Sequence, residues 1–177
     1  MCIRERGSGL PKWIFAFSAL LGCAMIGLSY AASLSRRVMT LRAWRRALLR
    51  LEVGLSYRSN ALAQMLYRAA ETEENIQVQS ALMGAASYMQ SNPLATCQQA
   101  MAMQTMEDLT AEDKTALLPC WEGLGAGTAE EQEKLLDGVQ GALKVQLSEA
   151  EEKEQKNRQL AASLGIIGGL ALFMMLI

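Results

Sequence analysis

The stretch AASLGIIGGLALFMMLI, residues 161–177, contains no charged side chain. A second uncharged stretch, WIFAFSALLGCAMIGLSYAASLS, occupies residues 13–35. A transmembrane helix needs about 20 mostly apolar residues, so both stretches have spanning length, the one at residues 161–177 at the short limit. We therefore expect one transmembrane helix over residues 13–35 and another over residues 160–177, with an N-terminal extension over residues 1–12.

The segment after the first apolar stretch is rich in arginine and forms a membrane-proximal basic collar: Arg36, Arg37, Arg42, Arg45, Arg46 and Arg50. Basic residues beside a membrane helix favour the cytoplasmic side. The collar thus predicts that residues 36–159 form a cytoplasmic domain and that both chain termini lie on the opposite side of the membrane. There the arginines would lie near the anionic inner leaflet, where each basic residue contributes about 1 kcal/mol. We expect the lipid bilayer, and no nucleic acid, as the partner of this segment.

An alternative topology is an exported domain released by signal cleavage. Arg4, Arg6 and Lys12 resemble the basic start of a signal peptide, and Ser29-Tyr30-Ala31 resembles a cleavage site. This alternative predicts a tail-anchored envelope binding module in which Cys97 and Cys120 can pair, because disulfides form in oxidising compartments. Six arginines directly after the apolar stretch oppose it.

Residues 36–159 follow helical periodicity, which predicts an all-α, membrane-anchored helical bundle with one transmembrane helix at each end. The first helix is expected to continue out of the membrane segment, with an apolar stripe at 3.6-residue spacing: Leu34, Val38, Leu41, Trp44 or Arg45, Leu48, Leu51 and Leu55. Asn60 is expected to cap a second helix that ends at Glu71, and residues 76–89 form a third.

Further helix starts are predicted from capping residues. Asn92-Pro93 is a favourable start, and Thr110 with Asp113 three residues later is a variant of the capping box that opens a helix to about Leu124, with Pro119 inside it. Gly123 to Gly127 are then expected to end this helix. Thr128 with Glu131 three residues later is a capping box that opens a long last helix. Its inner stripe is expected to be Leu136, Val139, Leu143, Leu147 and Ala150.

The composition argues against an enzyme or a metal protein. The chain has no histidine, and its four cysteines form no CxxC pair, which speaks against zinc sites and histidine-dependent catalysis. Gly123-x-Gly125-x-Gly127 lacks the lysine of a P-loop and follows no strand, so a helix end explains it better than phosphate binding. We expect no enzyme activity, no catalytic residues and no cofactor.

Charge is distributed unevenly along the domain. Residues 36–68 carry eight basic side chains and one acid, a balance of +7, whereas residues 71–154 carry sixteen acids and four lysines, a balance of −12. The net charge of the whole chain is only −1. The domain is therefore basic beside the first apolar stretch and acidic further along the chain.

Three stretches make the chain similar to the stage III sporulation protein AB family of endospore-forming bacteria. The first runs from Ser35-Arg36-Arg37 to Leu48-Leu49-Arg50-Leu51-Glu52. The second is the Leu-Gly turn with its following glutamine, Leu124 to Gln132. The third and most specific is a charged helix, Ala150-Glu151-Glu152-Lys153, that leads into Leu164-Gly165-Ile166-Ile167-Gly168-Gly169-Leu170.

The resemblance implies a non-enzymatic scaffold. Members of the family are similar to the type II secretion F-type platform proteins of the inner membrane and belong to the channel complex between mother cell and forespore. The implied partners are the other proteins of the stage III sporulation A operon, including a secretion-type ATPase, and homo-oligomerisation stays open. The domain would face the mother-cell cytoplasm. We expect a basic patch of the ATPase to dock on the acidic surface, with these residues as candidates: Glu107, Asp108, Glu112 and Asp113.

Overall fold

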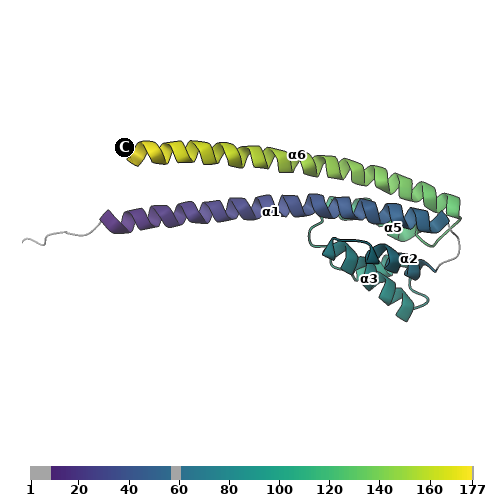
Figure 1. Cartoon of the computed structure of the whole chain (residues 1–177). Helices are drawn as coiled ribbons and strands as arrows, with labels where there is room; N and C mark the ends of the chain where they lie inside the picture. Colours follow the sequence, from purple (N-terminus) through teal and green to yellow (C-terminus); the bar gives the residue numbers. More distant parts are fainter. Residues whose placement is uncertain (1–8, 57–60, 177) are drawn as a thin grey trace, which may run out of the picture.

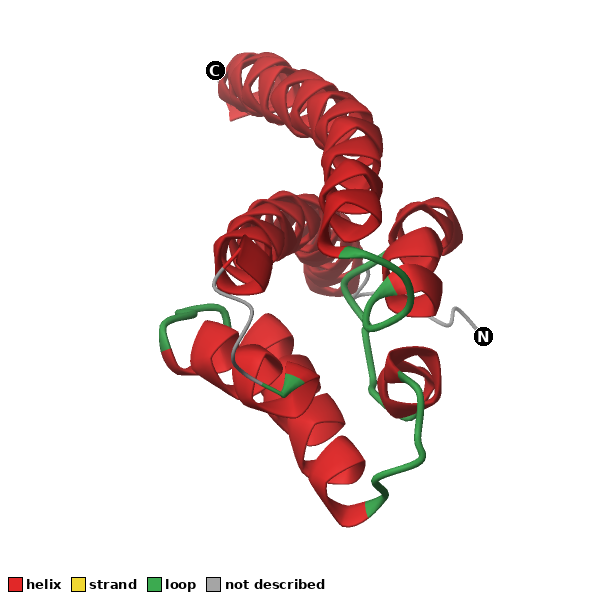
Figure 2. Ribbon diagram, turned by 90° about the vertical axis from the view of Figure 1, so that its right-hand side faces the viewer, coloured by secondary structure: helices red, strands yellow, loops and turns green. Residues whose placement is uncertain are grey.

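A computed structural model describes the backbone of residues 9–56 and 61–176, and within these the side chains of residues 25, 29–54, 61–128 and 130–160. All regular structure in these residues is helical: α1 (Gly9–Ser56), α2 (Leu62–Glu71), α3 (Ile76–Ser91), α4 (Cys97–Ala102), α5 (Ala111–Gly123) and α6 (Ala129–Leu176). The predicted all-α class is confirmed, and Figure 2 shows only helices and the loops that join them.

Two long antiparallel helices, α1 and α6, form the frame of the molecule (Figure 1). The start of α1 and the end of α6 lie at the same end of the frame, where the pair projects beyond the rest of the protein. The shorter helices gather at the other end. There α5 packs against α6, α2 pairs with α3, and α4 joins α3 to α5. Both long helices continue without a break into the bundle, as predicted.

Within the described residues, no helix is long and apolar enough to cross a membrane. Most side chains of residues 13–35 and 160–177, the two predicted transmembrane segments, lie outside the described part of the chain. The predicted extension at residues 1–12 lies outside it as well, except for the helical backbone from Gly9 onward.

One hydrophobic core joins all six helices. The predicted stripe of α6 is buried throughout, and on α1 it is Trp44, not Arg45, that occupies the inner position. Trp44 meets Trp121 of α5 with ring centroids 5.4 Å apart at 63°, the edge-to-face arrangement that aromatic pairs favour. This contact fixes α5 against α1 at the centre of the bundle.

Capping residues define the starts of α3, α4, α5 and α6. By contrast, α2 begins after Ala61, which makes no side-chain cap hydrogen bond, and the predicted cap Asn60 lies outside the described residues. Thr110 and Asp113 form a complete capping box at the start of α5. The prediction of a helix start at Asn92-Pro93 is wrong. Asn92 ends α3, where its amide donates to the Tyr88 carbonyl, and α4 begins after Thr96, which forms a capping box with Gln99. The helix begins at this capping box and not at Asn92-Pro93, because the box satisfies two backbone N–H groups at once.

The turn before α6 depends on glycine. Gly125 and Gly127 have φ values of +88° and +82°, a conformation in which other residues are strained. The Thr128–Glu131 capping box then opens α6. The side-chain amide of Gln132 donates to the Ala126 carbonyl and holds the turn against the helix start.

Candidate functional site

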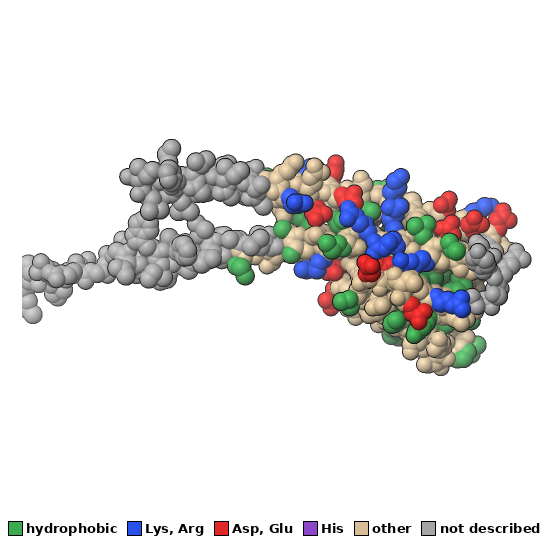
Figure 3. All heavy atoms as spheres, in the orientation of Figure 1, with side chains coloured by type: hydrophobic (Ala, Val, Ile, Leu, Met, Phe, Trp, Pro, Cys, Tyr) green, Lys and Arg blue, Asp and Glu red, His purple; other side chains and the backbone are tan. Residues whose placement is uncertain are grey.

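The basic collar of α1 lies against acidic residues of the other helices and of the connections between them. Five of its six arginines make ion pairs: Arg36 with Asp108, Arg37 with Asp113, Arg42 with Glu151, and both Arg46 and Arg50 with Glu73. Basic and acidic side chains accordingly alternate across the middle of the face drawn in Figure 3. We call these five arginines and their four acidic partners the ion-pair row.

The most buried member of the row is the Arg37–Asp113 pair. Two guanidinium nitrogens of Arg37, Nε and an Nη, each donate to one carboxylate oxygen of Asp113 at 2.8 Å, the bidentate geometry of a strong charge-assisted pair. The same Nη also lies 3.4 Å from the side-chain oxygen of Gln146. The pair therefore joins α1, α5 and α6 at one point.

Asp113 stays ionised although it has no solvent exposure. Burial by itself raises the pKa of the carboxyl, because a charge is less stable away from water. Hydrogen bonds from Arg37 and from the Thr110 backbone, together with the positive charge of Arg37, outweigh that effect and hold the pKa below its ordinary value. On the other side of the pair, the hydrogen bond to Asp113 raises the pKa of Arg37 despite its burial.

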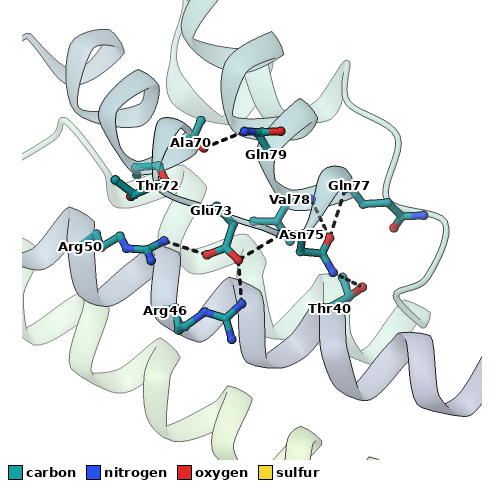
Figure 4. A network of polar contacts seen from close by, with 11 residues as sticks. Thr40, Arg46, Arg50, Ala70, Thr72, Glu73, Asn75, Gln77, Val78 and Gln79 are labelled. Atoms are coloured by element: carbon teal, nitrogen blue, oxygen red, sulfur yellow. Dashed lines mark hydrogen bonds and ion pairs between the residues drawn. The ribbon is translucent and has the colours of Figure 1, made fainter.

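A second buried carboxylate, Glu73, lies in the connection between α2 and α3 (Figure 4). One of its oxygens accepts from Arg46 at 2.7 Å and from the Asn75 backbone at 3.3 Å, and the other accepts from Arg50 at 2.8 Å. Asn75 caps α3 and donates to the Thr40 hydroxyl on α1. This network attaches the α2–α3 pair to α1.

The pKa of Glu73, like that of Asp113, is set by burial on one side and by hydrogen bonds and arginine charge on the other. Burial raises the pKa, but the hydrogen bonds from Arg46, Asn75 and Arg50 and the charge of Arg46 lower it by more, so it lies below the ordinary value. The remaining pairs of the row, Arg42–Glu151 and Arg36–Asp108, are more exposed to solvent. Arg45 makes no ion pair with the described residues, and its buried Nε finds no acceptor among them.

The four acids predicted to dock a partner do not form one exposed cluster. Glu107 and Glu112 are exposed, Asp108 is half-buried beside Arg36, and Asp113 is fully buried. Asp113 is thus unavailable to a partner, because its carboxylate is already enclosed by Arg37 and the capping box. Glu73 and Glu151 are not predictable as partners of the collar, because no local sequence pattern links them to α1.

The row holds helices together, and its buried carboxylates are not poised for acid–base chemistry near neutral pH. Its two buried carboxylates are kept ionised by arginine and so cannot donate or accept protons near neutral pH. No group of three or more metal-ligating side chains occurs in the part of the chain that was searched. Cys97 and Cys120 are free and buried, and burial raises the pKa of Cys97 to about 12 and raises that of Cys120 too, so neither is a reactive thiolate.

The fold and the site define an all-helical protein in which buried ion pairs link one helix to another. The family is shown by comparison: the sequence model of stage III sporulation protein AB matches residues 12–177, and the chain belongs to this family. The resemblance predicted from the sequence is confirmed. No curated protein and no solved structure matches the chain.

Proposed function

We propose that this protein is a non-enzymatic platform subunit, anchored by two membrane helices, in the sporulation channel complex between mother cell and forespore. Membership of a stage III sporulation family supports the sporulation role. The observation that carries the proposal is the frame: α1 and α6 run from the predicted membrane segments into the bundle without a break. Two continuous helices couple a domain to its anchors more stiffly than flexible linkers do.

The domain is proposed to face the mother-cell cytoplasm and to bind the secretion-type ATPase and other proteins of its operon. Glu107 and Glu112, with Asp108 beside them, provide the accessible acidic surface for a basic patch. They lie at the end of the domain closest to the projecting frame, because Asp108 and Asp113 contact Arg36 and Arg37. Asp113 is left out of this surface because it is buried.

Charge reversal tests the docking surface. The double variant Glu107→Arg/Glu112→Arg is expected to abolish co-purification of the ATPase with the full-length protein. The control is Glu133→Arg, which changes an exposed acid on α6 at the other end of the domain. Undiminished co-purification in the double variant would eliminate this surface.

A labelling experiment tests the topology against the alternative of an exported, signal-cleaved module. Cys97 and Cys120 are unsuitable reporters because both are buried. Leu94 is 98% exposed, so Leu94→Cys in a chain with serine at the other cysteines gives an accessible thiol. We expect an impermeant maleimide to label it only after lysis, whereas labelling in intact cells would support the exported module.

A further inference from the structure

A groove of about 430 Å³ lies between the end of α1 and α2. Met65 and Ala69 of α2 are buried at its floor, and Gly54 approaches the Met65 side chain so closely that an added Cβ would lie 3.3 Å from its terminal methyl. Leu49 and Val53 at the rim are 47% and 60% exposed. The described residues thus leave an apolar strip of α1 uncovered.

The charge of the groove is opposite to that of most of the domain. Its lining includes two arginines, Arg50 and Arg68, and no acidic residue. Arg50 gives one Nη to Glu73 and retains further N–H donors, since a guanidinium has five. Arg68 is exposed and has no ion pair with any described residue. The nearby acid Glu52 is directed elsewhere, because its carboxylate accepts from Gln140 on α6.

We infer that this groove binds an acidic amphipathic helix of a partner protein, with apolar side chains against Leu49, Val53 and Met65 and carboxylates against Arg50 and Arg68. The groove is open along α1, so it fits a helix laid on the surface better than an enclosed small molecule. Methionine at the floor adapts readily to different apolar side chains. The site differs from the acidic surface near α5 in location and in sign, and does not depend on it.

The test uses full-length protein in lipid nanodiscs, labelled with ¹³C in the methionine methyl groups. The probe is a helix-favouring peptide of about 20 residues with leucine at i, i+3 and i+7 and glutamate on both flanks. A matched peptide carries lysine in place of each glutamate. We expect the acidic peptide to shift the Met65 methyl resonance in a saturable way and to leave that of Met101, buried in α4, unchanged.

Charge variants separate this site from nonspecific binding. Arg68→Glu is expected to weaken binding of the acidic peptide about tenfold, since attraction at the rim becomes repulsion. Lys144→Glu makes the same charge change at an exposed position of α6 and should leave the affinity unchanged. Circular dichroism checks that both variants remain helical.

Three results would overturn the inference. The first is a Met65 resonance that does not respond to the acidic peptide, and the second is equal binding by the lysine peptide. The third uses laurate, a fatty-acid anion, as a second probe. If laurate shifts the Met65 resonance and the acidic peptide does not, the groove binds a small anionic amphiphile and not a helix.

Discussion

Asp113 and Glu73 are both buried carboxylates neutralised by arginines of α1, yet their surroundings differ. Asp113 pairs with one arginine, Arg37, and both side chains are almost completely shielded from solvent. Glu73 has two partners, and the side chains of Arg46 and Arg50 are 49% and 36% exposed. The first site is closed, and the second opens toward water through its arginines.

This difference determines what each site tolerates. At the closed site the loss of either member leaves a buried charge without compensation, which is strongly unfavourable. At the open site an arginine that loses Glu73 is still hydrated, and Glu73 keeps one partner if an arginine is lost. We therefore expect the junction of α1, α5 and α6 to depend on one pair, and the attachment of α2–α3 to be more tolerant.

The largest effect is expected for Arg37→Met, which removes the guanidinium that pairs with Asp113. It should reduce the free energy of unfolding by about 3–5 kcal/mol. The measurement is the urea midpoint of the full-length protein in detergent, followed by circular dichroism. Arg36→Met is the control, since its pair with Asp108 is longer, at 3.5 Å, and more exposed. Equal destabilisation by the two variants would contradict the distinction between closed and open pairs.

A smaller effect is expected for Glu73→Gln, which keeps the shape and one acceptor but removes the charge. Because Arg46 and Arg50 can be hydrated, the loss should be about 1–2 kcal/mol. Hydrogen exchange should show faster opening of α2 and α3, with α5 and α6 unaffected. Exchange that increases equally in all helices would show that Glu73 is not a local attachment point.

Acid should weaken both sites in the same direction. The folded-state pKa values of Asp113 and Glu73 lie below their ordinary values of 3.8 and 4.5, so the unfolded chain binds more protons in acid. Their contribution is complete above about pH 5 and is lost as the pH falls through the ordinary values toward the folded ones. We expect the urea midpoint to fall in this window, and to fall less steeply in an Asp113→Asn/Glu73→Gln variant.

The smallest effect is expected at the exposed pair between α1 and α6. Arg42 donates to Glu151 at 2.7 Å, but the two side chains are 52% and 43% exposed. Solvent and salt weaken such pairs, so Arg42→Met should cost less than about 1 kcal/mol. A midpoint shift as large as that of Arg37→Met would show that solvent exposure does not determine how much each ion pair contributes to stability.

Much of the fold is predictable because its signals are local. The capping boxes at Thr110 and Thr128 and the glycine turn each lie within a few residues of the helix end they define. The predicted helix start at Asn92 is wrong, because asparagine next to proline can end one helix as well as begin another. The start of α4 is instead defined by the capping box of Thr96 and Gln99.

The ion-pair row was less predictable, because its partners are distant in sequence. Arg37 and Asp113 are 76 residues apart. A signal did exist: Asp113 lies one helical turn before the buried Leu117, and Arg37 lies one turn before the buried Leu41, so both share the inner stripe of their helix. Opposite charges on two inward stripes predict a buried pair, whereas proximity to an apolar segment suggested only a membrane-facing collar.

A double-mutant cycle between Arg37 and Asp113 tests the central claim, that the collar arginines bind the bundle together, most directly. Arg37→Met, Asp113→Asn and the combined variant would be compared by urea unfolding, with the Arg42 and Glu151 cycle as reference. We expect a coupling energy of about 2–3 kcal/mol for the buried pair and less than about 0.5 kcal/mol for the reference. Equal coupling in the two cycles, or none at Arg37 and Asp113, would contradict it.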